Sequence, residues 1–351
     1  MKRGVIIAFV FGLALFIGVL VWRGAGPIMR ALEVAGWGML AVTAWHAVPL
    51  LFDSAGQWFA LPRAGRRLPR FHTVFRARWV GEAVNALLPV AQVGGLLVMA
   101  RMIAQRAYTV NAAGAGVTVG TAQQILAQIV FTIVGLLLLL HFAGGSPVAW
   151  SLVGAALGFC VLGAWLYRVQ RRGMFEPLAR FLGKMLGSHG GFELRGGAQA
   201  LDAAVDAIYT HRARVRASFV AYLLGWIAGF GEIWLALYFL GHPVSWLQAI
   251  FFESLGQAVY AMAFFIPGAL GIQEGGFVLL GAVIGVPADA AIVLSLIKRV
   301  RMLVLGVPGL VSWQWFEGRK LHGPARLGET APMGDGTSPS AKHCAQPPSR
   351  L

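Results

Sequence analysis

Charged residues are scarce in this chain of 351 residues: they make up 12% of the total, whereas hydrophobic residues make up 58%. A soluble domain carries about 25% charged residues, so a soluble fold is excluded. Cysteine is almost absent as well. Cys160 lies in an apolar stretch and Cys344 near the end, which provides neither a disulfide framework nor a metal-ligand spacing. Together with a mean hydropathy of +0.70, this predicts an all-α membrane protein that crosses the bilayer several times.

Acidic residues are also scarce. The chain has 14 acidic and 29 basic residues, which gives a formal net charge of +15. A soluble protein with this balance would be a candidate nucleic-acid binder. Here the basic residues gather between apolar runs and no recognition motif occurs, so no nucleic-acid partner is expected. The loop 63–78 holds six arginines and no acidic residue. This predicts a cytoplasmic loop and, counted along the chain, two cytoplasmic termini.

Signatures of catalysis are missing too. The eight histidines form no His-Glu-x-x-His motif, and the sequence has neither a Gly-x-Ser-x-Gly nucleophile elbow nor a phosphate-binding P-loop. No metal, cofactor or enzymatic activity is therefore expected. The alternative that stays open is a membrane enzyme, or an accessory subunit, that modifies a polar lipid head group.

What the sequence does contain is a series of apolar runs, which predict about six to eight transmembrane helices within an integral domain over residues 1–320. The first run, 5–22, is uncharged over 18 residues. The segment of about 168–216 has apolar residues at helical spacing and is expected to form amphipathic helices on the cytoplasmic side. The tail 321–351 is rich in Pro, Gly and Ser and is expected to be disordered.

Two of the apolar runs are interrupted by proline and glycine. The residues expected to break the helices are Pro89, Gly94 and Gly95 in the first half and Pro267, Gly268 and Gly271 in the second. Broken backbone cannot face lipid, so each segment is expected to form a re-entrant hairpin sheltered by protein. Basic residues on both sides of the first hairpin place its entrance on the cytoplasmic face, and the second is expected to enter from outside. The halves, about 36–141 and 216–317, would then form an inverted-topology repeat with a site near the midplane.

A basic cluster, Lys298, Arg299 and Arg301, lies inside the apolar run 290–316. Three cations in the bilayer cost on the order of 2.5–3.5 kcal/mol each unless they are paired or hydrated. Three interpretations stay open: a site for a lipid phosphate, a structural ion-pair network, or a cytoplasmic loop beyond the end of a helix. The candidate partners of the cluster are Glu232, Glu253 and Glu274.

Amide side chains complete the candidate site. Asn85 and Gln92 flank Pro89 and could satisfy backbone groups freed by the break, whereas Gln124 and Gln128 share one helix face and could line a cavity or join helices. Glu82 lies four residues after Arg78, which predicts an ion pair within one helix. The predicted substrate-binding residues are Lys298, Arg299, Arg301, Glu274, Glu253, Asn85, Gln92, Gln124 and Gln128.

The segment 266–274, Ile-Pro-Gly-Ala-Leu-Gly-Ile-Gln-Glu, resembles the lysylphosphatidylglycerol synthase transmembrane-region family, whose members are flippase-like. Residues 79–101, 275–287 and 297–301 are similar to a branch associated with hopanoid biosynthesis. The resemblance covers about residues 1–320. It implies a multi-pass protein of the bacterial inner membrane that moves lipids between leaflets, with an anionic phospholipid or a hopanoid-type lipid as its partner. Aminoacyltransferase activity is not expected, since no soluble synthase domain follows the last span.

Overall fold

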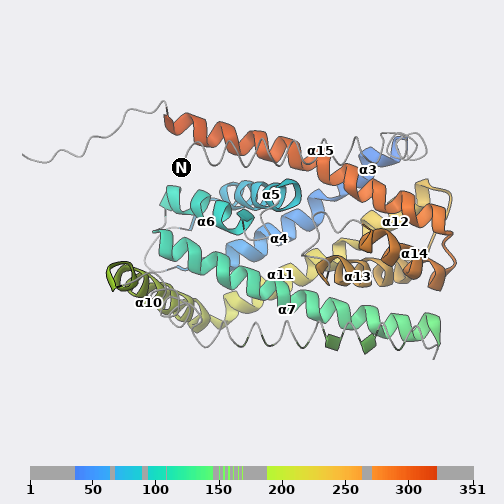
Figure 1. Cartoon of the computed structure of the whole chain (residues 1–351), viewed down its shortest axis with the longest axis horizontal. Helices are drawn as coiled ribbons and strands as arrows, with labels where there is room; N and C mark the ends of the chain where they lie inside the picture. Colours follow the sequence, from blue (N-terminus) through green and yellow to red (C-terminus); the bar gives the residue numbers. More distant parts are fainter. Residues whose placement is uncertain are drawn as a thin grey trace, which may run out of the picture.

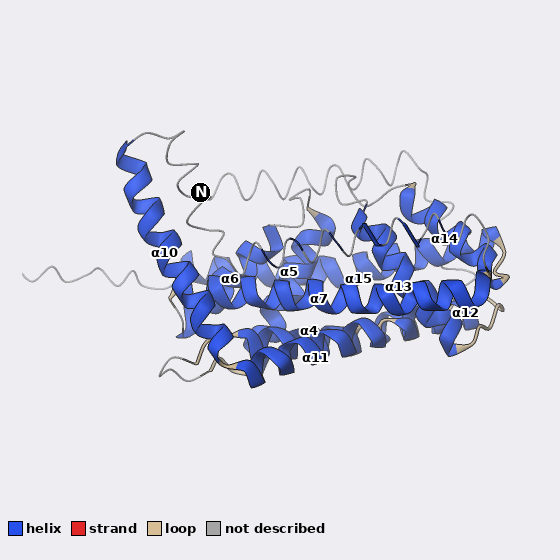
Figure 2. Ribbon diagram, turned by 90° about the horizontal axis from the view of Figure 1, so that it is seen from below, coloured by secondary structure: helices blue, strands red, loops and turns tan. Residues whose placement is uncertain are grey.

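The computed structural model describes residues 36–63, 68–88, 94–107, 109–144, 188–262 and 271–321, together with isolated positions between 150 and 168. The predicted first span and residues 322–351 of the tail lie outside these ranges, as do Pro89, Gln92, Pro267 and Gly268. Every regular element in the described part of the chain is a helix (Figure 2). The helices are α3 Gly38–Trp45, α4 Ala47–Ala60, α5 Phe71–Leu87, α6 Gly94–Ala107, α7 Val110–Ala143, α10 Ser188–Thr210, α11 Arg212–Ala228, α12 Phe230–Phe239, α13 Trp246–Met262, α14 Ile272–Ile284 and α15 Ala288–Leu321.

The helices form an elongated bundle in which the two longest, α7 and α15, run along opposite edges in the view of Figure 1. The chain between them packs as pairs: α4 on α11, α5 on α6, and α13 on α14. Helix α15 also packs against α5, and α7 packs against α13. Each long helix thus contacts the helix pair of the other half as well as its own, which locks the two halves together.

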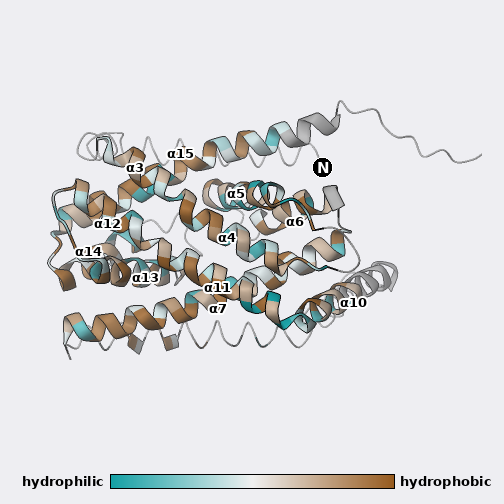
Figure 3. Cartoon of the chain, turned by 180° about the vertical axis from the view of Figure 1, so that it is seen from behind, coloured by the Kyte–Doolittle hydropathy of each residue, from teal (hydrophilic) through white to brown (hydrophobic). Residues whose placement is uncertain are grey.

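Hydrophobic residues occur along much of the length of the helices (Figure 3). Exposed large side chains recur at helical spacing on the outward faces of α7 and α15, the reverse of the pattern of a soluble helix. They are Val130, Ile133, Val134, Leu137 and Leu140 on α7 and Val304, Val307, Val311 and Trp315 on α15. Helix α7, and α11 with α12 over Arg212–Phe239, are long and apolar enough to cross a membrane. These features fit the predicted helical membrane protein, while the number of spans stays a prediction.

The ends of the described helices are consistent with both predicted interruptions. Helix α5 ends at Leu87 and α6 begins at Gly94, and α13 ends at Met262 before α14 begins at Ile272. Gly271 caps α14 with φ of +83°, a conformation that favours glycine. Gly94 and Gly95, however, do not break the backbone as expected, because they form the first turn of α6. At each interruption the chain forms two helices that pack against each other, whereas an uninterrupted apolar run would form a single helix.

Gly95 instead allows α6 to pack closely against α5. A Cβ atom at this position would overlap the carbonyl oxygen of Gly81 and the side chain of Asn85. The Asn85 Oδ1 atom accepts a hydrogen bond from the Gly95 backbone N–H at 2.8 Å. This bond satisfies one of the backbone donors left free at the start of a helix, as the position of Asn85 beside the break predicted.

The predicted amphipathic linker is described from Ser188 onward, where it forms α10. The apolar face of α10 packs on protein: Val205 and Ile208 are buried against Ala115 and Val119 of α7. Hydrophobic spacing thus identified the helix correctly. Its buried face is matched by another helix of the same chain, so a membrane surface is not needed to cover it.

The contact between α5 and α6 can be tested with two alanine substitutions of opposite expected effect. Gly95→Ala adds a methyl group against backbone that cannot move away, and overpacking of this kind costs about 1–3 kcal/mol. Gly275→Ala on α14 meets open space and should gain about 0.5–1 kcal/mol from helix propensity. Thermal unfolding of the purified protein should show a lower melting temperature for Gly95→Ala alone. Equal melting temperatures for both variants would contradict the close contact.

Candidate functional site

Each cation of the basic cluster has a carboxylate partner on a different helix. The Lys298 Nζ atom lies 2.5 Å from Glu253 Oε2 on α13. The Arg299 Nη2 atom lies 2.7 Å from Glu274 Oε1 on α14. The Arg301 Nη1 atom lies 3.0 Å from Glu232 Oε1 on α12. The three carboxylates that the sequence offered as partners are therefore the ones used, and an ion-pair network is present.

The loop interpretation of the cluster is wrong. Residues 298–301 lie in the interior of α15, which continues to Leu321. Lys298 and Arg301 are three residues apart and therefore share one helix face, which points into the bundle. Successive residues of an α-helix are rotated by about 100°, so Arg299 points away from that face and toward the start of α14.

The three pairs differ in burial, and the difference separates their possible roles. The exposed fractions are 9% and 5% for Lys298 and Glu253, and 11% and 3% for Arg301 and Glu232. Arg299 and Glu274 are 20% and 24% exposed. Glu253 is further held by Gln257, whose Nε2 donates to Glu253 Oε1 at 2.7 Å. The Arg299–Glu274 pair is thus the one that an incoming molecule could reach.

A further, partly buried pair joins α4 to α5. The Arg78 Nη2 atom donates to Asp53 Oδ2 at 2.8 Å, and Gln124 Nε2 of α7 reaches the same oxygen at 3.4 Å. The predicted ion pair between Arg78 and Glu82 is therefore wrong: α4 packs against α5 and presents a closer carboxylate. Gln124 acts as a link between α7 and α4, and Gln128 lies half-buried on α7.

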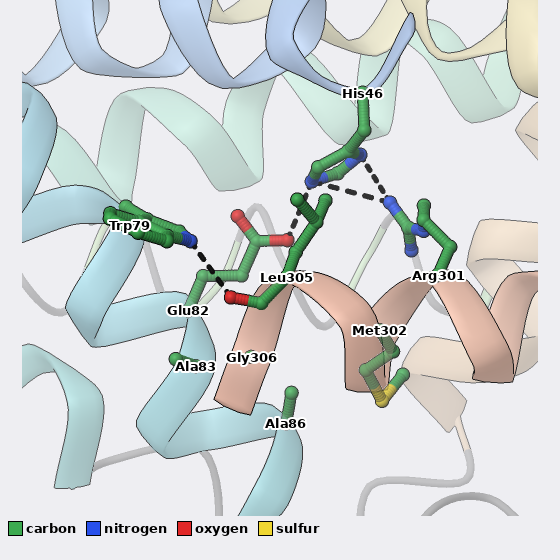
Figure 4. Close-up of a pocket in the computed structure, with 9 residues that line it drawn as sticks. All are labelled: His46, Trp79, Glu82, Ala83, Ala86, Arg301, Met302, Leu305 and Gly306. Carbon is green, nitrogen blue, oxygen red and sulfur yellow. Dashed lines mark hydrogen bonds and ion pairs between the residues drawn. The ribbon is translucent and has the colours of Figure 1, made fainter. Parts of the chain in front are cut away.

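His46, at the junction of α3 and α4, links these elements to α15 (Figure 4). Its Nε2 atom lies 2.9 Å from Glu82 Oε1, and its Nδ1 atom lies 2.5 Å from Glu232 Oε1. The guanidinium group of Arg301 also contacts the imidazole ring. Sequence analysis missed this residue because it is a single histidine in an apolar run, and its partners are 36 and 186 positions away.

A small cavity opens beside this cluster, between α5 and α15 (Figure 4). Its volume of about 20 Å³ has room for a water molecule and not for a lipid head group. It is lined by His46, Trp79, Glu82, Ala83, Ala86, Arg301, Met302, Leu305 and Gly306. The Arg301 Nε atom is buried without a hydrogen-bond partner among the described residues, and the Glu82 side chain is 38% exposed. The cluster thus borders a small cavity that is also lined by the partly exposed Glu82.

The structure brings only part of the predicted site together. Of the predicted substrate-binding residues that it describes, Arg301 lines the cavity, while Asn85, Gln124 and Gln128 do not. Gln92 lies outside the described residues. Within the described ranges, no group of three or more His, Cys, Asp or Glu side chains is arranged to hold a metal ion.

Comparison with known proteins gives one match. The sequence matches the family described as the lysylphosphatidylglycerol synthase TM region over residues 5–309. The match includes both interrupted helix pairs and the basic cluster of α15, and it identifies no branch within the family. No curated protein and no solved structure matches the chain.

The Lys298–Glu253 pair should behave as a mutually dependent unit. Lys298→Met or Glu253→Gln alone leaves one buried charge without its partner, which costs about 3–5 kcal/mol. The double variant removes both charges and should recover most of that loss. Asp289→Ala, at an exposed position in the first turn of α15, is the control and should change stability by less than about 1 kcal/mol. Thermal unfolding in detergent measures all four, and additive losses in the double variant would contradict the pairing.

Proposed function

The chain belongs to the lysylphosphatidylglycerol synthase transmembrane-region family, and from this membership we propose that it is a multi-pass protein of the bacterial inner membrane that moves polar lipids between leaflets. A lipid translocase must offer a polar route for the head group while the acyl chains stay in the bilayer. The features below support this proposal over a purely structural membrane protein.

The observation that carries the proposal is the set of paired charges inside an apolar bundle. Buried ion pairs can often be replaced by apolar residues without loss of stability. A protein that only had to remain folded in the membrane would not need Lys298, Arg301 and their carboxylates in its interior. Ionisable groups within membrane helices commonly mark a route for substrates or ions.

The arrangement of the two halves supports the same function. We interpret α4–α7 and α11–α15 as an inverted repeat, with the α5–α6 and α13–α14 pairs as hairpins that enter from opposite faces. Two matched features favour this interpretation: each pair is interrupted, and each long helix packs against the interrupted pair of the other half. In transporters built this way, the substrate site lies near the bilayer midplane where the repeats meet.

Arg299 is the proposed contact for the head group. Its Nε and Nη2 atoms both donate to Glu274 Oε1, at 3.1 and 2.7 Å. The two parallel donors of a guanidinium fork also fit a phosphate. Because this pair is more exposed than the other two, a lipid phosphate could replace Glu274 on Arg299 while Lys298 and Arg301 keep their partners.

Glu274 would have a second partner in that exchange. Its Oε2 atom accepts a hydrogen bond from the Gly271 backbone N–H at 2.7 Å, so the carboxylate would remain held at the start of α14. The favoured cargo is therefore an anionic phospholipid. A hopanoid-type lipid, as the resemblance to the hopanoid-associated branch implied, would use this contact only as a conjugate that carries an anionic group.

The proposal is tested with purified protein in liposomes that contain a fluorescent phosphatidylglycerol, whose arrival in the outer leaflet is followed by quenching. Wild-type protein should transfer the lipid. Loss of a charge-assisted hydrogen bond of about 1.5–3 kcal/mol should slow Arg299→Ala and Glu274→Ala by on the order of tenfold or more. Arg212→Ala, at an exposed position at the start of α11, should transfer lipid at the wild-type rate.

Three results would redirect the proposal. Unchanged transfer by Arg299→Ala and Glu274→Ala would rule out this contact. The absence of transfer by the wild-type protein would rule out a translocase for this lipid. Conversion of the added lipid into a product with an altered head group would identify the enzymatic alternative.

A further inference from the structure

One carboxylate of the ion pairs that link α4, α5, α12, α13, α14 and α15 has a histidine rather than an arginine or lysine as its partner. These pairs contain five carboxylates, Asp53, Glu82, Glu232, Glu253 and Glu274, and four permanent cations, Arg78, Lys298, Arg299 and Arg301. Four of the carboxylates pair one-to-one with those cations. Glu82 remains, and its ion-pair partner is His46. A proton on the imidazole ring would give the partly exposed Glu82 carboxylate a cationic partner.

The surroundings of His46 favour the charged ring in the resting state. The ionisable groups of this region are Asp53 from α4, Arg78 and Glu82 from α5, Tyr222 from α11, Glu232 from α12, Glu253 from α13, and Lys298 and Arg301 from α15. The permanent cations among them have carboxylates of their own. A neutral ring would leave one net negative charge in the cluster, whereas an imidazolium ion leaves none.

The ring also has partners in both protonation states. A charged ring donates from both nitrogens, and here Nδ1 faces Glu232 while Nε2 faces Glu82. A neutral ring with its hydrogen on Nδ1 keeps the bond to Glu232, and its Nε2 atom can accept from the Arg301 Nη1 atom at 3.2 Å. Loss of the Nε2 proton therefore exchanges Glu82 for Arg301 as the partner of Nε2, without leaving a ring nitrogen unsatisfied.

We propose that His46 and Glu82 form a proton-binding site that couples proton movement to lipid movement, an inference that rests on the translocase function proposed above. On release, the Nε2 proton passes across the 2.9 Å contact to Glu82 Oε1. The ring and the Glu82 carboxyl group are then both neutral. Glu82 next gives the proton to a water molecule and returns to its carboxylate form, so that the network loses one positive charge.

The cavity supplies the route for that proton. It has room for one water molecule between α5 and α15, and both His46 and Glu82 line it. Glu82 is the most exposed of the five carboxylates, at 38%, whereas Glu232 is 3% exposed. The proton can thus leave through Glu82 while the Glu232 side stays closed to water.

Coupling to the lipid follows from the position of α15. Arg301, which changes partner with the proton, lies two residues from Arg299, the proposed phosphate contact. A change in charge at His46 therefore acts on the helix that holds the head group. Uptake of one proton with one singly charged anionic lipid would also make the transfer electrically neutral.

The test uses the liposome assay with a pH gradient of one unit and a pH-sensitive dye trapped inside. If one proton moves with each lipid, a gradient of one pH unit should hold the labelled lipid at a leaflet ratio of about tenfold. In His46→Gln and Glu82→Gln the ratio should fall to about one, because one proton no longer travels with each lipid. His72→Gln, at an exposed position on the same helix as Glu82, should keep the wild-type ratio.

Glu82→Gln decides the question if His46→Gln does not fold, because it removes the unmatched carboxylate while keeping the side-chain volume. If wild-type protein transfers lipid but the leaflet ratio does not respond to the pH gradient, the proton site is overturned. The translocase proposal is then unaffected. Retention of the gradient effect in Glu82→Gln would also overturn the proton site. No transfer under any condition would overturn the proposed function and this inference with it.

Discussion

The compensation of buried charge is the constraint on which the rest of the structure depends. Helix α15 carries three cations within four residues, and each one pairs with a different helix: α13, α14 or α12. An unpaired charge in such an interior is costly, so these pairs fix the rotation of α15 and its register against three neighbours. The Asp53–Arg78 pair does the same for α4 and α5. His46 then joins the two groups of helices through Glu82 and Glu232.

The helices that carry this ion-pair network pack closely against one another. Gly81 and Gly95 let α5 and α6 approach closely. Similarly, Gly306 of α15 lies against Leu87 of α5, so the two helices that line the cavity are themselves in contact. The cavity is consequently limited to about 20 Å³. A cavity of this size holds a water molecule and no head group, so the proposed lipid passage would require the helices around the Arg299–Glu274 pair to separate.

The sequence predicted those features that depend on local composition. Apolar runs identified the helical membrane class, proline and glycine marked both interruptions, and the burial cost of Lys298, Arg299 and Arg301 led to their three carboxylate partners. Pairings that depend on how distant helices meet were missed. Arg78 has Glu82 one turn away but pairs with Asp53 of α4. His46 had no pattern around it to indicate its role, and Gly95 was assigned to the break although it serves the packing of a helix.

The central claim is that paired charges lie within the lipid-embedded part of the bundle. Determination of the structure in a lipid nanodisc by electron cryomicroscopy tests it most directly. The account predicts density for the Lys298–Glu253 and Arg301–Glu232–His46 contacts inside the boundaries of the lipid disc. Density that placed these side chains in bulk solvent, or apart from one another within the disc, would contradict it.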